Sequence, residues 1–356
     1  MRFPEFSGEW EKCKFGDIAT GFDYGMNAAA KPFDGENKYI RITDIDEASS
    51  TYNDTDIVSP DGSLTDNYVV NDRDILLART GASTGKSYLY RKSDGKLYYA
   101  GFLIRANVTE HNPYFVFSQL HTHRYWRWVS IMSARSGQPG INSQEYSSFP
   151  IFTTSLHEEN KIASLLSRLD ERIATQNKII EDLKKLKSAI VDRLYSSTNG
   201  ETYSFCQLFE VVNEKNKKLD YRNVLSASQE LGMIERSDIN IDIKFEQESI
   251  SGYKIVRKGD YVVHLRSFQG GFAFSDRTGI CSPAYTILRP NDLVEYGYLS
   301  HFFTSKLFIK SLKLVTYGIR DGRSINVDEW LNMTVTLPNI QEQVRILTII
   351  NAIDAK

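Results

Sequence analysis

The chain has 356 residues, with 43 Lys and Arg against 45 Asp and Glu, so its formal charge is -2. Hydrophobic residues make up 41% and charged residues 25%, the proportions of a soluble globular protein with enough apolar material for a core. This composition excludes a mainly disordered chain. The lack of an apolar run near the roughly 20 residues that span a bilayer excludes a membrane protein.

The N-terminus and the cysteines bear on the compartment. Residues 1–6 lack the basic start and apolar core of a secretion signal. Cys13, Cys206 and Cys281 are far apart and odd in number, and none has a second Cys or a His at metal-ligand spacing. We therefore expect a cytoplasmic protein with reduced thiols and no bound metal.

Residues 1–154 predict a mixed, strand-rich domain. β-branched and aromatic residues mark strands at residues 74–79, 87–90 and 101–105. An apolar stripe marks a helix at residues 114–132.

Residues 155–196 predict one long helix. Ten positions step alternately by four and three, and eight of them are apolar, which is the seam of a coiled coil. The seam consists of Ile162, Leu166, Leu169, Ile173, Gln176, Ile180, Leu183, Lys187, Ile190 and Leu194. At 1.5 Å per residue such a helix is about 60 Å long, and it needs a partner to cover its stripe.

The rest of the chain repeats this order. Residues 140–146 and 157–162 resemble residues 324–330 and 341–346 at an offset of 184, and Asp74 matches Asp260 at an offset of 186. After a polar linker at 196–201, strands are expected at 260–265 and 284–288 and a helix at 293–314. Residues 197–339 therefore predict a second domain of the same kind.

A second seam helix begins near Gln341 and has Ile346, Ile350 and Ile353 in phase. We expect it at residues 340–356, short and antiparallel to the first. Since it has only about four turns, either the helix is truncated or another chain covers the rest of the seam. The predicted fold is α+β, with two similar strand-rich domains joined by a long coiled-coil helix.

Three motifs that would carry chemistry fail on inspection. Residues 81–87 resemble a phosphate-binding P-loop, but three residues separate the glycines where four are required, and a strand follows. Residues 112–115 lack the second proline of the Asn-Pro-Pro-aromatic loop that holds adenine in amino-methyltransferases. His121 and His123 are two residues apart in a helical stretch and point to different faces. The motifs do not support catalysis.

The net charge hides a segregation along the chain. Residues 1–78 carry -9 and residues 79–135 carry +7, while residues 201–253 carry -4 and residues 254–323 carry +6. A basic surface on one side of each domain would suit a phosphate backbone. The alternative is that the charges fold into interspersed surface pairs.

Polar, glycine-rich loops lie in the basic segments, two in each domain. They span residues 79–86 and 133–138 in the first domain and 266–271 and 317–324 in the second. Arg and Lys can bind guanine or phosphate, Gln can bind adenine, and Ser or Thr can bind either. The predicted DNA contacts are Arg79, Ser83, Thr84, Lys86, Arg135, Gln138, Arg266, Gln269, Arg320, Arg323 and Ser324. The alternative is that these are hairpin turns with capping polar residues.

The whole pattern resembles the specificity (S) subunits of type I restriction-modification systems. The resemblance covers essentially the whole chain and includes its duplicated order. It is carried by residues 2–6, Trp10, residues 16–18, 39–45, 74–76 and 137–142, and by each Pro-containing segment that leads into Glu-Glu or Glu-Gln and then a helix.

This resemblance implies a non-catalytic subunit of a phage-defence system. Two target-recognition domains would each read one half of a split DNA sequence, and the helices would act as the spacer. The partners would be double-stranded DNA, two methyltransferase (M) subunits that modify adenine, and restriction (R) subunits. S-adenosylmethionine, ATP and Mg²⁺ would bind to those partners rather than to this chain.

Two alternatives remain open. One is an enzyme, a fused modification or nuclease chain, although no methyl-donor or metal motif is found. The other is a truncated or variant S subunit that acts as a dimerising or regulatory scaffold, with self-association through the unpaired seam.

Overall fold

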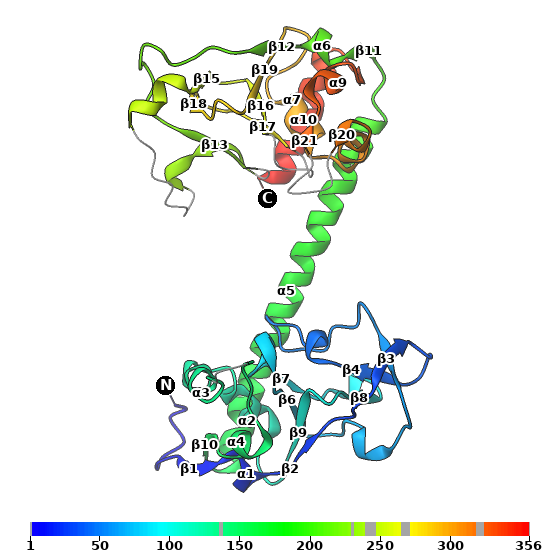
Figure 1. The fold of residues 1–356 in the computed structure, drawn as a ribbon, viewed down its shortest axis with the longest axis vertical. Helices are drawn as coiled ribbons and strands as arrows, with labels where there is room; N and C mark the ends of the chain where they lie inside the picture. Colours follow the sequence, from blue (N-terminus) through cyan, green and yellow to red (C-terminus); the bar gives the residue numbers. More distant parts are fainter. Residues whose placement is uncertain are drawn as a thin grey trace. The chain divides into compact units, whose positions relative to one another are not determined.

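The computed structural model describes residues 2–134, 138–228, 231–238, 247–264, 271–317 and 324–355. It divides into two compact units, Met1–Lys178 and Ile179–Lys356. Figure 1 shows that each unit is mixed, with strands and short helices, and that the long helix α5 (Leu156–Ser196) contributes to both. The α+β fold predicted from the sequence is confirmed.

Unit 1 is built around an antiparallel sheet with the strand order β2-β9-β6-β7. Its strands are β1 (Glu11–Lys14), β2 (Ala19–Tyr24), β3 (Ala29–Pro32), β4 (Lys38–Ile40), β5 (Val58–Asp61), β6 (Asp74–Ala78), β7 (Ser87–Leu89), β8 (Leu97–Tyr99), β9 (Leu103–Val108) and β10 (Pro150–Thr153). Its helices are α1 (Phe15–Ile18), α2 (Pro113–Gln119), α3 (His123–Met132) and α4 (Ser143–Ser147).

Both faces of this sheet are buried, and strand β6 shows how. Because successive side chains of a strand point to opposite faces, Ile75 and Leu77 enter a core with α1 to α4. Leu76 and Ala78 enter a second core with β4 and β8. In Figure 1 the helices and the β4–β8 pair accordingly lie on opposite sides of β6.

Unit 2 repeats this design, with a four-stranded sheet of order β12-β19-β16-β17. Its strands are β11 (Glu201–Ser204), β12 (Phe209–Val212), β13 (Leu225–Ser228), β14 (Gly232–Glu235), β15 (Lys254–Val256), β16 (Tyr261–Val263), β17 (Phe272–Phe274), β18 (Gly279–Cys281), β19 (Thr286–Pro290), β20 (Thr316–Tyr317), β21 (Ser324–Ile325) and β22 (Thr334–Leu337). Its helices are α6 (Phe205–Leu208), α7 (Tyr298–Thr304), α8 (Lys306–Ser311), α9 (Val327–Leu331) and α10 (Ile340–Asp354).

The helix predicted at residues 114–132 is in fact two helices, and so is its counterpart at 293–314. The side chain of Thr122 accepts a hydrogen bond from the backbone N–H of Tyr125 and thereby starts α3. Ser305 starts α8 in the same way by accepting from Phe308. A hydroxyl at the N-cap satisfies a backbone donor that a continuous helix would pair internally, so both copies break at the same place.

Helix α10 and the last turns of α5 contribute to the same core of unit 2. Ile346 and Ile350 share one hydrophobic core with Val191 and Tyr195. At the end of α10, Asp354 forms an ion pair with Lys187. The later residues of α10 thus meet the earlier residues of this part of α5, which is the predicted antiparallel arrangement.

No helix in the described parts of the chain is both long enough and apolar enough to cross a membrane.

Candidate nucleic-acid interface

The predicted loop at residues 79–86 lies beside the segment that follows the second predicted loop of the first domain. The β6–β7 loop, residues 79–86, meets the segment 138–141 through backbone hydrogen bonds. Gly81 N–H donates to the carbonyl oxygen of Pro139 at 3.0 Å, and Ile141 N–H donates to that of Arg79 at 2.9 Å. Two segments that are more than 50 residues apart in the sequence therefore form one surface.

Two glycines allow the first loop to take its shape. Gly81 and Gly85 have φ angles of +70° and +95°, which L side chains rarely adopt. At Gly85 a Cβ atom would also lie 2.8 Å from Val129 and 2.9 Å from Trp126 of α3. The glycine pattern that resembles a P-loop is thus explained by turn geometry, and the loop leads into strand β7 rather than into a helix.

Arg79, Ser83 and Gln138 are placed at or near this surface. Gln138 is exposed, and a Cβ on Gly81 would lie 3.2 Å from its Nε2 atom. Arg79 is half-buried, and its Nε atom donates to the carbonyl oxygen of Gly101 at 3.0 Å. Ser83 is half-buried and accepts the backbone N–H of Lys86 on its carbonyl oxygen. Their contacts with DNA stay a prediction.

Thr84 is buried inside the loop, and its contact with DNA stays a prediction. Only 7% of Thr84 is exposed. Its hydroxyl donates to the carbonyl oxygen of Gly81 at 2.8 Å and also lies 3.4 Å from that of Pro139. The hydroxyl closes the turn, which is the hairpin alternative for this residue.

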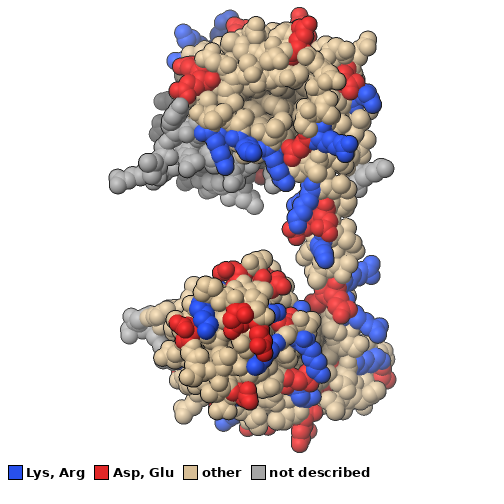
Figure 2. Space-filling view, turned by 90° about the vertical axis from the view of Figure 1, so that its right-hand side faces the viewer, with Lys and Arg blue, Asp and Glu red and all other residues tan. Residues whose placement is uncertain are grey.

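The predicted basic face is partly neutralised. Lys86 lies 3.1 Å from Glu47, and Arg105 lies 3.2 Å from Asp23, so the basic segment of unit 1 pairs with its acidic segment. Arg257 and Glu214 do the same in unit 2, at 3.1 Å. On the face drawn in Figure 2 both acidic and basic side chains are visible on each unit. For these residues the alternative of interspersed pairs is correct, and surface pairs of this kind are weak enough to exchange for a phosphate.

The predicted contacts of the second domain fall mostly outside the described residues. This applies to Arg266, Gln269, Arg320 and Arg323, and in the first domain to Arg135. Ser324 lies in strand β21, where its backbone pairs with that of Tyr317. The described ends of the two loops therefore lie in the pairs β16–β17 and β20–β21.

The seam of α5 is uncovered in its middle. Every residue from 168 to 186 is exposed, and Leu169, Ile173, Ile180 and Leu183 are between 48% and 58% exposed. Towards the two ends, the seam residues Ile162, Leu166, Ile190 and Leu194 are half-buried, and Leu194 packs on the core of unit 2. A neighbouring stripe of exposed apolar residues, not among the predicted seam positions, comprises Leu165, Ile179 and Leu186.

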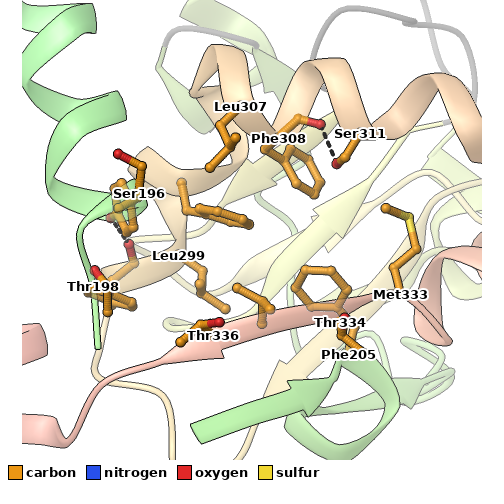
Figure 3. Close-up of a pocket in the computed structure, with 14 residues that line it drawn as sticks. Ser196, Thr198, Phe205, Leu299, Leu307, Phe308, Ser311, Met333, Thr334 and Thr336 are labelled. Atoms are coloured by element: carbon orange, nitrogen blue, oxygen red, sulfur yellow. Dashed lines mark hydrogen bonds between the residues drawn. The ribbon is translucent and has the colours of Figure 1, made fainter. Parts of the chain in front are cut away.

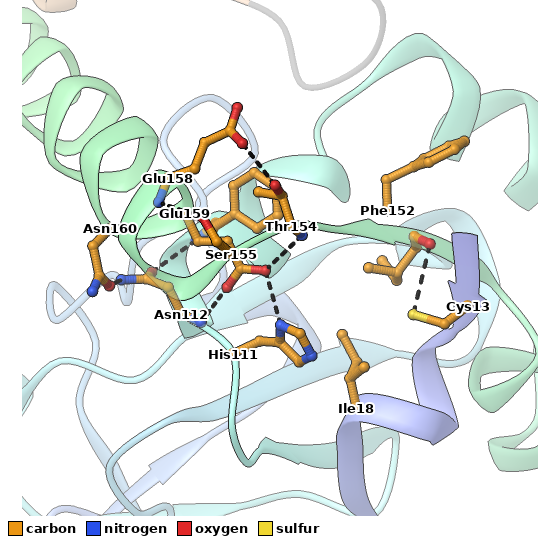
Figure 4. A network of polar contacts seen from close by, with 12 residues as sticks. Cys13, Ile18, His111, Asn112, Phe152, Thr154, Ser155, Glu158, Glu159 and Asn160 are labelled. Carbon is orange, nitrogen blue, oxygen red and sulfur yellow. Dashed lines mark hydrogen bonds and ion pairs between the residues drawn. The ribbon is translucent and has the colours of Figure 1, made fainter. Parts of the chain in front are cut away.

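Buried carboxylates fix the start of α5 to unit 1 (Figure 4). Glu159, which is fully buried, accepts from the backbone N–H groups of Asn112 and Thr154 at 2.8 and 3.2 Å, and its Oε1 atom lies 2.8 Å from Nδ1 of His111. Glu158 accepts two hydrogen bonds from Arg2, at 2.7 and 2.6 Å. This bonding to Arg2 lowers the pKa of Glu158 to about 2. The helix is therefore held by polar bonds as well as by its apolar residues.

A cavity of about 370 Å³ lies in unit 2 beside the end of α5 (Figure 3). Phe205, Leu299 and Phe308 line its interior, while Thr198 and Thr336 add hydroxyls. No Asp, Glu, His, Lys, Arg or Cys is found among the described residues that line it. The described lining thus offers apolar side chains, hydroxyls and the thioether of Met333, but no carboxylate, imidazole, amine or thiol.

No group of three or more His, Cys, Asp or Glu side chains in the described parts of the chain could hold a metal ion. What the sequence analysis did miss is a pair of exposed aromatic residues, Tyr24 and Phe102, beside Arg79. They come from distant segments, so only the folded chain brings them together.

Comparison with known proteins agrees with this architecture. The family described as "Type I restriction modification DNA specificity domain" matches residues 7–185, half of the chain. The specificity subunit of the type I restriction enzyme MjaVIII from Methanocaldococcus jannaschii is 23% identical over 389 residues, covering 99% of this chain and 87% of that protein.

Two solved structures share the fold. The S subunit of a type I restriction-modification system from M. genitalium has a TM-score of 0.57 at 13% identity, covering 98% of this chain and 90% of that one. A chain from a study of the assembly and conformational transition of the type I system has a TM-score of 0.57 at 14% identity, covering 97% and 90%. Because the family model matches half of this chain, the chain belongs to the type I restriction-modification DNA specificity subunits.

Proposed function

We propose that this subunit recognises a bipartite DNA sequence, one part with each unit. The observation that carries the proposal is the duplication of the sheet: β2-β9-β6-β7 in unit 1 and β12-β19-β16-β17 in unit 2 have the same connectivity. Because each unit has its own hydrophobic cores, and the sequence predicts a pair of polar loops for each, each can read DNA separately. Helix α5 then sets the distance between the two parts of the target.

We further propose that the chain has no catalytic activity and works by positioning other proteins. Two M subunits and the R subunits would bind to it in the cytoplasm. S-adenosylmethionine, ATP and Mg²⁺ would act on those subunits. The exposed apolar stretch of α5 at residues 168–186 supports a role in assembly, since an apolar helix face of this length is usually covered by another helix.

Mapping methylated adenines tests the proposal. The chain and its M subunits are expressed together in cells that lack adenine methylation, and the modified sites are read across the genome. A split motif with a fixed spacer is expected, and it must vanish when this chain is omitted. A continuous motif, or a motif that persists without the chain, would contradict the proposal.

A second candidate function is that of a dimerising or regulatory scaffold. The uncovered seam favours this function, because the α5 helices of two copies of the chain can pair antiparallel with each other. In a register where paired residue numbers sum to 349, Leu169 faces Ile180 and Leu166 faces Leu183 of the other copy. Mass measurement by light scattering, with and without the M subunit, separates the two functions. A dimer that M subunits cannot dissociate would favour the scaffold.

The enzyme alternative has a direct test as well. Binding of labelled S-adenosylmethionine by the isolated chain would support the enzyme alternative. The expected result is no binding, because the sequence has no methyl-donor motif. The aromatic loop at residues 112–115, which resembles the adenine-binding loop of amino-methyltransferases, starts α2 in this chain. The side chain of Asn112 there accepts the backbone N–H groups of Tyr114 and Phe115.

A further inference from the structure

Arg79 is held between two aromatic rings. Its guanidinium carbon lies 4.8 Å from the ring centre of Tyr24 and 6.0 Å from that of Phe102. Its Nε atom donates to the carbonyl oxygen of Gly101, and its backbone N–H donates to that of Phe102, both at 3.0 Å. The cation–π contacts and the Nε hydrogen bond orient the guanidinium before a partner binds, while the backbone hydrogen bond fixes the main chain of Arg79. We call Arg79, Tyr24 and Phe102 the Arg79 cluster.

The two rings are exposed although their segments are well fixed. Phe102 is 55% exposed and Tyr24 is 41% exposed. Phe102 lies in a turn that is closed by a 2.8 Å hydrogen bond from Leu103 to Ala100. The hydroxyl of Tyr24 accepts the backbone N–H of Ser143 at 3.3 Å. Isolated exposed apolar residues are ordinary, but two rings around one arginine are not explained by the packing of the unit.

The cluster borders the surface formed by the β6–β7 loop and the segment 138–141 of unit 1. Arg79 is the first residue of the β6–β7 loop, and its carbonyl oxygen accepts from Ile141, which follows the second loop. Tyr24 reaches the same segment through Ser143. Three segments, the end of β2, the end of β6 and the β8–β9 turn, thus contribute one residue each to a common edge of that surface.

The chemistry of the cluster fits duplex DNA. A guanidinium offers donors in a rigid fork that matches the acceptors of a guanine edge. An aromatic ring beside it can contact a thymine methyl group or a sugar without losing a hydrogen bond. An acidic protein partner would use the arginine but would leave both rings without a role. We propose that the Arg79 cluster reads one base step in the part of the target bound by unit 1, with Arg79 donating to a base edge and Phe102 packing against the neighbouring base pair.

This inference rests on the proposed function, and one experiment separates the two. The full chain is expressed with its M subunits, and methylated adenines are mapped for the wild type and for Arg79→Ala, Phe102→Ala and Tyr24→Ala. The matched control is Phe33→Ala, an exposed phenylalanine of the same unit for which no contact with an arginine is found among the described residues. Melting curves of each purified chain check that it folds.

The expected result is specific to one half of the motif. Arg79→Ala should reduce methylation by roughly 5- to 150-fold, and Phe102→Ala by about fivefold or more, with preference relaxed at adjacent positions of the same half. Phe33→Ala should leave the motif unchanged. If the Phe102→Ala and Tyr24→Ala variants fold and keep the wild-type motif and methylation rate, the proposal for the Arg79 cluster is wrong, while the proposed function stands. If the wild type gives no split motif, both are wrong.

Discussion

Glu159 and Gln343 occupy matching positions of the two units, 184 residues apart, and both side chains are fully buried. Glu159 accepts hydrogen bonds from backbone groups, whereas Gln343 both accepts and donates them. Glu159 accepts from two backbone N–H groups. Gln343 accepts from the backbone N–H of Glu295 at 2.8 Å but also donates to the carbonyl oxygens of Leu293 and Pro338 at 2.9 Å each. Each unit thus joins its helix through a side chain suited to its own donors and acceptors.

Exchanging these two side chains should destabilise both units. Gln343→Glu would place a carboxylate against two carbonyl oxygens in a dry site and should lower the free energy of unfolding by about 3 kcal/mol or more. Glu159→Gln would turn an amide donor towards another donor and should cost about 1–3 kcal/mol. Urea unfolding measures both, with the exposed Glu171→Gln as the control. Equal, near-zero effects would contradict the assigned hydrogen bonds.

Acid should release the N-terminal segment from α5. Bonding to Arg2, then to Thr154 and Trp10, lowers the pKa of Glu158 to about 2. Since this value lies below that of an unfolded chain, about 4.3, the stabilisation is complete above pH 4.3 and is lost as the pH falls towards 2. The fluorescence of Trp10 is obtained by subtracting the emission of Trp10→Phe from that of the wild type. This fluorescence should therefore change between pH 4.3 and 2. In Glu158→Gln this acid-dependent change should be missing.

The buried aspartates at the start of β6 and β16 should differ in their sensitivity to mutation. Asp260 is 2% exposed and receives two 2.9 Å hydrogen bonds from Arg289. Its counterpart Asp74 receives a 2.7 Å bond from the neutral Asn107, and burial raises the pKa of Asp74. Arg289→Ala should lower the free energy of unfolding by about 3 kcal/mol and Asn107→Ala by about 1 kcal/mol. A larger loss for Asn107→Ala would contradict this assignment.

Much of this architecture can be predicted from the sequence, but the details of the surface cannot. The heptad pattern predicts α5 from Leu156 to Ser196, and the structure has it there. The break before α3 depends on the single hydroxyl of Thr122. In the sequence alone, a threonine that caps a helix looks the same as a threonine inside one. The ring of Phe102 and the carboxylate of Glu47 reach Arg79 and Lys86 only after folding. Segregated charge along the sequence therefore does not exclude ion pairs between the acidic and basic segments, such as Lys86 with Glu47.

The exposed seam should be needed for assembly but not for folding. Leu169 and Ile180 are each about half exposed, so Leu169→Lys and Ile180→Lys should change the free energy of unfolding by less than about 0.5 kcal/mol. The same changes would place an ammonium group in a helix interface and should abolish co-purification of the M subunit. Thr175→Lys adds the same charge away from the seam and should assemble normally. Normal assembly of all three variants would exclude the seam as the docking face.

A mutation in the loops of one unit should impair recognition of only one part of the DNA motif. Arg320→Ala and Arg323→Ala, both changes in the second loop of unit 2, should cost about 1–3 kcal/mol for each contact to a base and should relax only the part of the motif that unit 2 reads. Arg79→Ala should affect only the other part. The measurement is the affinity for duplexes altered in one part at a time, at two salt concentrations. It separates base reading from phosphate contacts, because losing a phosphate contact lowers the salt dependence of binding for all duplexes alike. Arg345→Ala, on the exposed side of α10, serves as the control. Equal losses in both parts would show that the units do not read DNA separately, and the bipartite proposal would then be wrong.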